Sequence, residues 1–289
     1  MGCLQLNALA QFAELNELTD LFERHGISVL VLKGVLLAKD LYGDLGARQS
    51  WDIDLVISKG DIKKVDTLFQ KLGYQRQKLT PKQMSQHLKN AKDFVYTHPN
   101  KHFQVELHWR LFQDWDCFDP FKVPHSKVEV GGQVFKVLAP EYNLIYLCTH
   151  GAESYWARAQ WAQDIYQLLE KYGPSLDWAL IWKVAAKYDL TGALEEGLGK
   201  SHQFKSLPKY QPYAWRFKAW WRRLLLRKRL KNRVRVIISL LVPRTQDYEI
   251  FLLPDKLYGL YYFLRPFGAL KRNRVRSQYC HTSAGWYPE

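Results

Sequence analysis

Two aspartates open a short alternating segment, Arg48-Gln-Ser-Trp-Asp-Ile-Asp-Leu-Val-Ile57, and they constrain the fold more than any other feature of the chain. Apolar residues recur at every second position after Asp52, a period that predicts a β-strand with one buried face. Both carboxylates then share the opposite face, about 6.6 Å apart along the backbone, since a strand rises about 3.3 Å per residue. Two ionised carboxylates at about 5 Å repel by about 3 kcal/mol at an effective dielectric constant near 20. Asp52 and Asp54 therefore predict a neutralising cation, and Mg²⁺ suits them because it binds one or two carboxylates together with phosphate oxygens and water. An acidic pair on a wetted strand face is the alternative.

A second alternating segment, Phe103-Gln-Val-Glu-Leu-His-Trp-Arg-Leu111, follows about fifty residues later. Its apolar residues share one face, and Glu106 and His108 share the other. If this strand lies beside the first one, Glu106 becomes a third carboxylate directed at the same place as Asp52 and Asp54. His108 is then a candidate residue of the same cleft.

A glycine turn precedes the acidic pair. The segment Ser28-Val-Leu-Val-Leu-Lys-Gly34 predicts a short buried strand that ends at glycine, and the following residues to about Tyr42 have helical spacing. A strand, a glycine turn and a helix N-terminus form a natural seat for phosphate, because free backbone N–H groups point outward there. Gly34 is therefore a candidate for phosphate binding.

Together these segments resemble the bacterial nucleotidyltransferase family of the DNA polymerase β superfold, in its branch with a Leu-Lys-Gly opening. The matching segments are Leu32-Lys-Gly34, Leu41-Tyr42, Arg48, Asp52-Ile-Asp-Leu-Val56, Gly73-Tyr74 and Val105-Glu-Leu-His-Trp109. The likeness continues through His150, Trp156, Asp164 and the region from Pro243 to Pro266. It implies an α+β fold, in which a mixed sheet with flanking helices is followed by a helical C-terminal region.

The resemblance also implies a chemistry. Asp52 and Asp54 would hold two Mg²⁺ ions, or Mn²⁺, and Glu106 would share one ion and help to activate the acceptor hydroxyl. Two metal ions about 3.5–4 Å apart stabilise the attacking and the leaving oxygen of an in-line displacement at phosphorus. The expected reaction moves a nucleoside monophosphate from a nucleoside triphosphate (NTP) to a hydroxyl or phosphate acceptor and releases pyrophosphate. A small molecule such as a sugar phosphate or an antibiotic, an RNA 3′ end and a protein hydroxyl are all open as acceptors.

The chain departs from the family pattern at two places. Gly34-Val35 stands where the superfamily usually has Gly-Ser or Gly-Gly, so one hydroxyl contact to phosphate is absent. Lys33 and Arg48 are candidates to hold the phosphates instead, with simple solvated charge as the alternative for each. The third carboxylate is Glu106 rather than the commoner aspartate, so its side chain is longer.

Two other classes of protein stay open at this point. Glycosyltransferases that act on nucleotide sugars also use an Asp-x-Asp pair with a divalent ion. There the pair usually ends an apolar strand, whereas here it opens one, which favours nucleotidyl transfer. A non-catalytic relative that keeps the fold and binds RNA or a membrane surface is the second alternative, since the usual Gly-Ser turn is missing.

We predict two domains. Residues 1–139 form an α/β domain with a lead helix from about Gln5 to His25 and an appended hairpin around Gly131-Gly132, a pair that suits a tight two-residue loop. Residues 140–289 form a helical domain that is basic and rich in aromatic residues toward its end.

Three polar residues stand out in the helical part, namely His150, Arg158 and Asp164. In one interpretation His150 and Asp164 form a buried pair that fixes helix packing. In the other, His150 or Arg158 lies at the cleft and touches the base or the acceptor.

The positive charge is concentrated in the last third of the chain. From Lys205 to Arg276 there are 19 Lys or Arg and 3 acidic residues, in a chain whose net charge is +14. Within this region, Tyr213 to Leu230 interleaves Trp, Phe and Leu with Arg and Lys. Three interpretations fit that stretch: a core helix whose basic side chains extend to water, a helix on an anionic membrane surface, and a contact to a nucleic-acid backbone. The tail from Lys271 to Arg276 fits a solvated end.

The remaining features concern the cellular compartment. No apolar run approaches the ~18 residues of a membrane-spanning helix, and no signal-type segment precedes Glu14. The four cysteines lack the spacing of a zinc site or a disulfide framework. We therefore expect a cytoplasmic protein, with peripheral attachment to a membrane through residues 205–276 as an option.

Overall fold

The computed structural model describes most of the chain, namely residues 2–112, 117–207 and 216–268. The chain divides into two compact units. Unit 1 comprises Met1–Arg76 and Lys92–Asn232, and unit 2 comprises Gln77–Ala91 and Arg233–Glu289. The domain boundary predicted at residue 139 stays a prediction.

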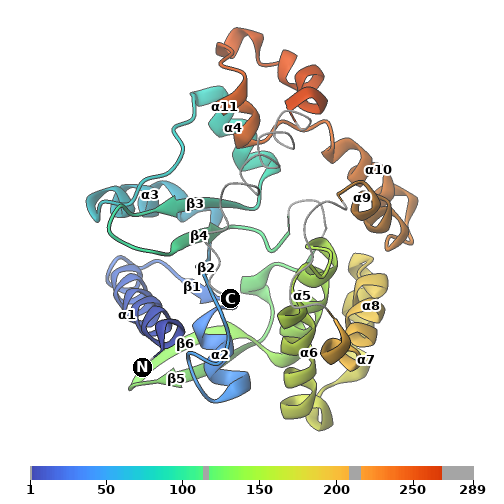
Figure 1. Ribbon diagram of the computed structural model, residues 1–289. Coiled ribbons are helices and arrows are strands. Elements are labelled where there is room, and N and C mark those ends of the chain that lie inside the picture. The colour runs from blue at the N-terminus through green and yellow to red at the C-terminus, as the bar shows by residue number, and fades with distance from the viewer. Residues whose placement is uncertain (1, 113–116, 208–215, 269–289) are drawn as a thin grey trace. The chain divides into compact units, whose positions relative to one another are not determined.

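A four-stranded mixed sheet belongs to unit 1, with the strand order β1-β2-β4-β3 (Figure 1). The strands are β1 (Val29–Val31), β2 (Asp52–Ile57), β3 (Asp93–Thr97) and β4 (Gln104–His108). β2 runs parallel to β4, whereas β1 is antiparallel to β2 and β3 is antiparallel to β4. The two acidic segments are thus neighbouring strands, and the first of them begins at Asp52.

β2 is more deeply buried than its alternation predicts. The pattern predicts one buried face and one polar face, but every residue from Ile53 to Ile57 is buried and Asp54 is fully so. The reason lies in the strand's surroundings. β2 is a central strand, α1 (Cys3–Arg24) packs on it, and Tyr146 of α5 (Pro140–Glu153) lies close enough to Asp54 for their charges to interact.

Two elements of the structure are not predicted by the sequence patterns, α4 (Pro81–Asn90) and β3. α4 begins with a good capping signal, because Thr80 Oγ1 accepts a hydrogen bond from the backbone of Gln83 and proline occupies the first helical position. β3 pairs antiparallel with β4, with Asp93 opposite His108 and Thr97 opposite Gln104.

The lead helix and the hairpin are confirmed. α1 ends at Arg24, and Gly26 follows with a φ of +64°. The hairpin consists of β5 (His125–Val130) and β6 (Gln133–Leu138), and the two glycines between them both have positive φ, as a tight two-residue turn requires.

Helices surround the sheet of unit 1 and share its core. They are α2 (Val35–Tyr42), α3 (Ile62–Lys71), α6 (Ala159–Tyr172), α7 (Trp178–Tyr188), α8 (Thr191–His202) and α9 (Arg216–Leu225), with short 3₁₀ turns at Lys59–Asp61, Pro120–Lys122, Gly173–Ser175 and Phe204–Ser206. One buried apolar cluster includes Leu30 and Val56 of the sheet together with Leu144, Leu168 and Leu194 of the helices. Burying each such side chain stabilises the fold by about 1.5–3 kcal/mol, so this cluster holds the helices firmly against the strands that carry the acidic residues.

Unit 2 has a small aromatic core of its own. Its helices include α4, α11 (Thr245–Ile250) and most of α10 (Leu230–Ser239), followed by a 3₁₀ turn at Asp255–Leu257. Tyr248, Tyr258 and Tyr261 pack together in that core, and the buried Asp247 pairs with Arg265 at 3.2 Å.

Some of the predicted basic segments lie outside the described residues. These are Tyr213 to Trp215 and the tail from Lys271 to Arg276, and side chains in the first half of α9 are likewise not described. Within the ranges that the structure describes, no helix is both long enough and apolar enough to cross a membrane.

Candidate active site

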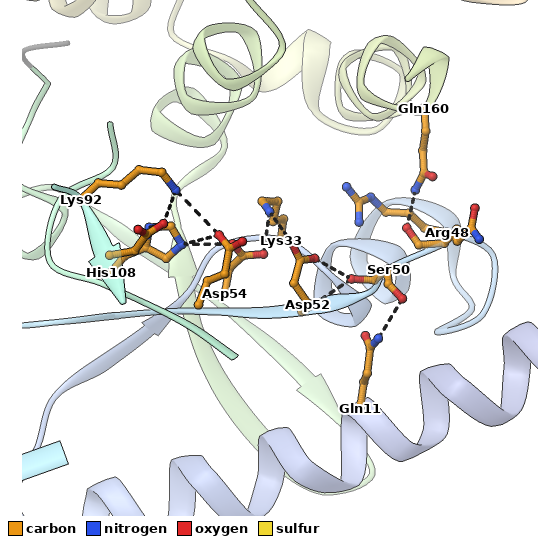
Figure 2. A network of polar contacts seen from close by, with 12 residues as sticks. Gln11, Lys33, Arg48, Ser50, Asp52, Asp54, Lys92, His108 and Gln160 are labelled. Carbon is orange, nitrogen blue, oxygen red and sulfur yellow. Dashed lines mark hydrogen bonds and ion pairs between the residues drawn. The ribbon is translucent and has the colours of Figure 1, made fainter. Parts of the chain in front are cut away.

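Asp54 and Glu106 lie opposite each other on neighbouring strands. The register of β2 and β4 pairs Asp54 with Glu106 and Asp52 with Gln104. The exposed fractions of the three carboxylate side chains are 0% for Asp54, 20% for Glu106 and 27% for Asp52. Figure 2 shows Asp52 and Asp54 directed into one polar network with residues of other elements. Strand pairing alone therefore gathers the acidic residues, while their catalytic roles stay predictions.

Lys33, just after β1, lies against both aspartates (Figure 2). Its Nζ is 2.7 Å from Asp54 Oδ2 and 3.4 Å from Asp52 Oδ2. Burial lowers the pKa of Lys33, but the charges of Asp54 and Asp52 outweigh it and hold that pKa well above its usual value. Burial likewise raises the pKa of Asp54, but Lys33 and His108 bring it far below its usual range. The pKa of Asp52 is raised, by burial and by the charge of Asp54. Lys33 is thus a built-in cation that offsets one of the two negative charges of the aspartate pair.

His108 contacts the other side of Asp54. Its Nε2 is 3.1 Å from Asp54 Oδ1 and 3.4 Å from Glu106 Oε2, and the ring is buried. Burial and the charge of Lys92 lower the pKa of His108, but its contacts with Asp54 and Glu106 raise it above its usual value. The sequence-based placement of His108 near the acidic residues agrees with this geometry, and its role is taken up below.

Three further residues surround the site without standing out in the sequence, namely Lys92, Asp93 and Tyr146. Lys92 Nζ is 2.5 Å from Asp93 Oδ2 and 3.7 Å from Glu106 Oε2. Tyr146 is buried, and burial raises the pKa of its hydroxyl. A signal for the first two exists in the alternation of Asp93-Phe-Val-Tyr-Thr97, because a strand there pairs across the turn with the end of β4.

The charge of Glu106 should make part of the stability depend on pH. Burial raises the pKa of its carboxyl, but the contact with His108 and the charge of Lys92 bring it from 4.5 down to about 2. A carboxyl with a lowered pKa in the folded state stabilises the protein above its unfolded pKa and loses that contribution as pH falls toward its folded pKa. Between pH 7 and pH 3.5 the wild-type protein should therefore lose about 1 kcal/mol more unfolding free energy than Glu106→Gln, measured by urea denaturation. Equal losses in the two proteins would show that the charge of Glu106 is not stabilised in the fold.

The glycine turn before α2 has a backbone conformation that other residues rarely adopt, and phosphate binding there stays a prediction. Gly34 has φ +74° and ψ −141°, a conformation open essentially to glycine alone. The hydroxyl of Ser50 lies 3.5 Å from the place that a Cβ on Gly34 would occupy, and it donates to the backbone oxygen of Asp52 at 2.9 Å. A serine hydroxyl is therefore present beside the turn although the residue after Gly34 is valine.

Arg48 and Asp164 form a buried ion pair that joins the loop before β2 to α6. Arg48 Nε donates to both carboxylate oxygens of Asp164, at 3.0 and 2.9 Å, and the hydroxyl of Tyr42 donates to the same carboxylate at 2.8 Å. The partners of Asp164 are thus Arg48 and Tyr42, which corrects the interpretation of His150 and Asp164 as one buried pair. A buried guanidinium needs a counter-charge, and Asp164 supplies it. Phosphate binding by Arg48 stays a prediction.

His150 and Arg158 lie on the helical side of unit 1. The ring of His150 stacks at 6.0 Å on Tyr146 and meets Trp161 edge-on at 5.1 Å. Burial and the charge of Lys33 hold the pKa of His150 well below its usual value, so its imidazole is neutral. Arg158 directly precedes α6 and is partly exposed. Contacts of either residue with a base or an acceptor stay predictions.

The donor atoms around Asp54 fit a divalent metal ion. Asp54, Glu106 and His108 each offer one ligand atom, and these atoms lie within 4.8 Å of one another. Asp52 is outside this group, and its Oδ2 lies 3.4 Å from Lys33 Nζ. The carboxylates and the imidazole are of the kinds that bind divalent ions in proteins.

A comparison with models of protein families shows which family the chain belongs to. A family model described as "Uncharacterised nucleotidyltransferase" matches residues 4–204. The chain belongs to this family. No curated protein matches this nucleotidyltransferase. The predicted fold class, a mixed α+β sheet with flanking helices and a helical C-terminal region, is confirmed.

This nucleotidyltransferase is also similar to solved structures at low sequence identity. The lincomycin-bound lincosamide antibiotic adenylyltransferase LnuA is 17% identical, covers 54% of this chain and 94% of its own, and has a TM-score of 0.39. ANT(2")-Ia in complex with adenylyl-2"-tobramycin is 11% identical, covers 68% and 98%, and has a TM-score of 0.42. An antigenic nucleotidyltransferase-like protein from Paracoccidioides brasiliensis is 16% identical, covers 62% and 88%, and has a TM-score of 0.37.

Proposed function

We propose that this nucleotidyltransferase moves a nucleoside monophosphate from an NTP to a hydroxyl or phosphate group of an acceptor still to be identified. The observation that carries the proposal is the pairing of Asp54 with Glu106 across parallel strands, with Lys33 2.7 Å from Asp54. Membership of a nucleotidyltransferase family supports the reaction type. In the proposed step the acceptor oxygen forms a bond to the α-phosphorus of the NTP. The bond between that phosphorus and the oxygen that links it to the β-phosphorus breaks. Pyrophosphate leaves, and the hydroxyl proton passes by way of Glu106 to water.

Each residue of the site then has a role that its position supports. A divalent ion, Mg²⁺ or Mn²⁺, held by Asp54 and Glu106 with Asp52 as a further carboxylate, would stabilise the charge on the reacting oxygens. Lys33 offsets one negative charge of the aspartates before NTP binds and pairs with its phosphates afterwards, because a lysine ammonium is a mobile point charge that suits phosphate. The backbone N–H groups at the start of α2, next to Gly34, receive the same phosphates.

Two differently labelled nucleotides test this proposal. The purified protein is incubated with Mn²⁺ or Mg²⁺ and each NTP in turn, with a cell lysate as the source of acceptor. Label on the α-phosphate should appear in a product, label on the γ-phosphate should appear in pyrophosphate, and removal of the ion by EDTA should abolish both. Product labelled from the γ-phosphate would contradict the proposal and indicate a kinase-type transfer. Label transferred from the sugar of a nucleotide sugar would favour a glycosyltransferase, and no transfer with any NTP would favour the non-catalytic alternative.

A membrane surface is a second proposed partner, and α10 carries the observation that favours it. One apolar stripe with helical spacing is exposed: Leu230 at 75%, Val234 at 44%, Ile237 at 47% and Ile238 at 54%, with Leu241 at 49% just after the helix. Basic residues flank it, namely Lys231, Arg233 and Arg235, all exposed. Likewise, Trp221 and Leu225 of α9 are exposed rather than buried in a core. An exposed apolar stripe with basic flanks fits the interface of an anionic bilayer.

Vesicle flotation tests this second partner. The protein should float with vesicles that contain phosphatidylserine, float less at high salt and stay behind with phosphatidylcholine alone, because basic residues near the surface add about 1 kcal/mol each. Replacing Ile237 and Ile238 by serine should lower the bound fraction at least about tenfold, since each loses up to ~1.5–3 kcal/mol of apolar burial. Leu72→Ser removes an equally exposed leucine from unit 1 and is the matched control. Equal binding by all three proteins would exclude the stripe as the membrane contact.

A further inference from the structure

The two oxygens of Asp54 face two different partners. Oδ2 is 2.7 Å from Lys33 Nζ, whereas Oδ1 is 3.1 Å from His108 Nε2. The same His108 nitrogen is 3.4 Å from Glu106 Oε2. On the Lys33 side, one ammonium group already offsets one of the two negative charges of Asp52 and Asp54. On the His108 side, two carboxylate oxygens and one imidazole nitrogen converge within 4.8 Å of one another.

Packing holds the His108 ring in place. It is fully enclosed, with 2% of the side chain exposed, so its orientation is fixed by packing. Its other nitrogen, Nδ1, is buried, lies 3.9 Å from Asp93 Oδ2 and makes no hydrogen bond to the described residues. The second ring nitrogen of a metal-bound histidine usually donates to a carboxylate, and Asp93 would have to move closer to accept that bond. Nε2 is directed toward Asp54 and Glu106.

A nitrogen donor changes which ion such a site prefers. Mg²⁺ binds oxygen ligands and keeps several waters, whereas Mn²⁺ also binds carboxylates and begins the first-row series whose affinity for sites with nitrogen donors rises toward Cu²⁺. We propose that Asp54, Glu106 and His108 form a single metal site with one histidine ligand, which binds Mn²⁺ in preference to Mg²⁺ while Lys33 offsets the charge on the Asp52 side. In the absence of nucleotide the site then binds one ion rather than the pair that the family resemblance implies. This inference concerns the ion of the proposed transferase site, but its test does not depend on transfer.

The competing explanation is that His108 itself takes the place of the ion. A protonated imidazole between Asp54 and Glu106 would neutralise both carboxylates and would leave no position for a metal on that side. The two explanations can be distinguished directly. Only the first predicts that a nitrogen of His108 is bonded to a bound metal ion.

The experiment uses the full chain with Mn²⁺ or Mg²⁺ alone, in the absence of nucleotide. Isothermal titration should give one Mn²⁺ per chain, bound at least about tenfold more tightly than Mg²⁺. His108→Gln should weaken Mn²⁺ binding by at least about tenfold and Mg²⁺ binding much less, so that the preference disappears. His102→Gln removes an exposed histidine and should change neither affinity.

Electron spin-echo spectroscopy of the frozen Mn²⁺ complex supplies the second readout. Protein made with ¹⁵N-labelled histidine should show a coupling of one histidine nitrogen to the ion, and His108→Gln should lack it. The coupling in the wild-type protein decides the question even if the variant does not fold. Mn²⁺ bound without nitrogen coupling, or no Mn²⁺ bound at all, would overturn the inference in favour of the imidazole as cation. Nitrogen coupling in a protein that transfers no nucleotide would uphold this inference and refute the proposed function.

Discussion

Asp54→Asn should abolish nucleotide transfer and weaken the fold, while Asp52→Asn should spare most of the stability. Asp54 is fully buried and contacts both Lys33 and His108, so the neutral amide leaves Lys33 with Asp52 alone, at 3.4 Å. Removing one partner of a buried ion pair costs about 3–5 kcal/mol, and we expect the lower end because Asp52 remains. Loss of an ion ligand should lower the transfer rate at least about 10³-fold, which corresponds to about 4 kcal/mol of transition-state stabilisation.

The comparison of the two aspartates makes the prediction specific. Asp52 is partly exposed, and its pKa is raised by burial and by Asp54, so its neutral form is less unfavourable in the fold. Asp52→Asn should therefore change the unfolding free energy by less than about 1 kcal/mol. Urea denaturation in EDTA measures the stability of both variants, and the α-labelled NTP assay at temperatures where both are folded measures transfer. Equal stability losses, or an Asp54→Asn protein that still transfers, would remove Asp54 from the centre of the site.

Most of the sheet could be predicted because its signals are local. The alternation around Asp52 and Glu106, the glycine turn at Gly34 and the Gly131-Gly132 hairpin each depend on neighbouring residues in the chain. The order of β1, α2, β2 and β4 then follows from a known pattern of strands and helices, whereas α4 and β3 are not predicted. Local signals therefore predict well where these strands lie in the sequence and which of their residues share a face.

The electrostatic partners in the site were harder to predict, because they depend on contacts distant in sequence. Asp52 and Asp54 required a cation, but nothing local shows that Lys33 lies 2.7 Å from Asp54 or that His108 lies on its other side. The pairing of Arg48 with Asp164 spans 116 residues. Such pairs form only after the helical part packs on the sheet through the shared apolar core. Sequence reasoning therefore found the charged residues without assigning their partners.

Asp164→Asn should destabilise the protein by about 3–5 kcal/mol, since it leaves the buried Arg48 without its counter-charge. Asp119→Asn is the matched control, because Asp119 and its partner Lys122 are exposed and such a surface pair contributes about 0–1 kcal/mol. Urea denaturation of both variants measures the difference. A cost below about 1 kcal/mol for Asp164→Asn would show that Arg48 is solvated or bound elsewhere.

The double variant Arg48→Met with Asp164→Leu separates the two roles that Arg48 could have. Replacing a buried ion pair by apolar residues of similar size is often neutral or stabilising, so the double variant should recover most of the stability that Asp164→Asn loses. If Arg48 serves only to join the loop before β2 to α6, NTP affinity in the double variant should also return to the wild-type value. If Arg48 holds a phosphate as well, the recovered protein should still bind NTP about 10-fold to 100-fold more weakly, which is the loss of one charge-assisted hydrogen bond of about 1.5–3 kcal/mol. Titration of NTP into the wild-type protein and the double variant distinguishes these outcomes. Both proteins are then folded, so a difference in NTP affinity reports only on phosphate binding by Arg48.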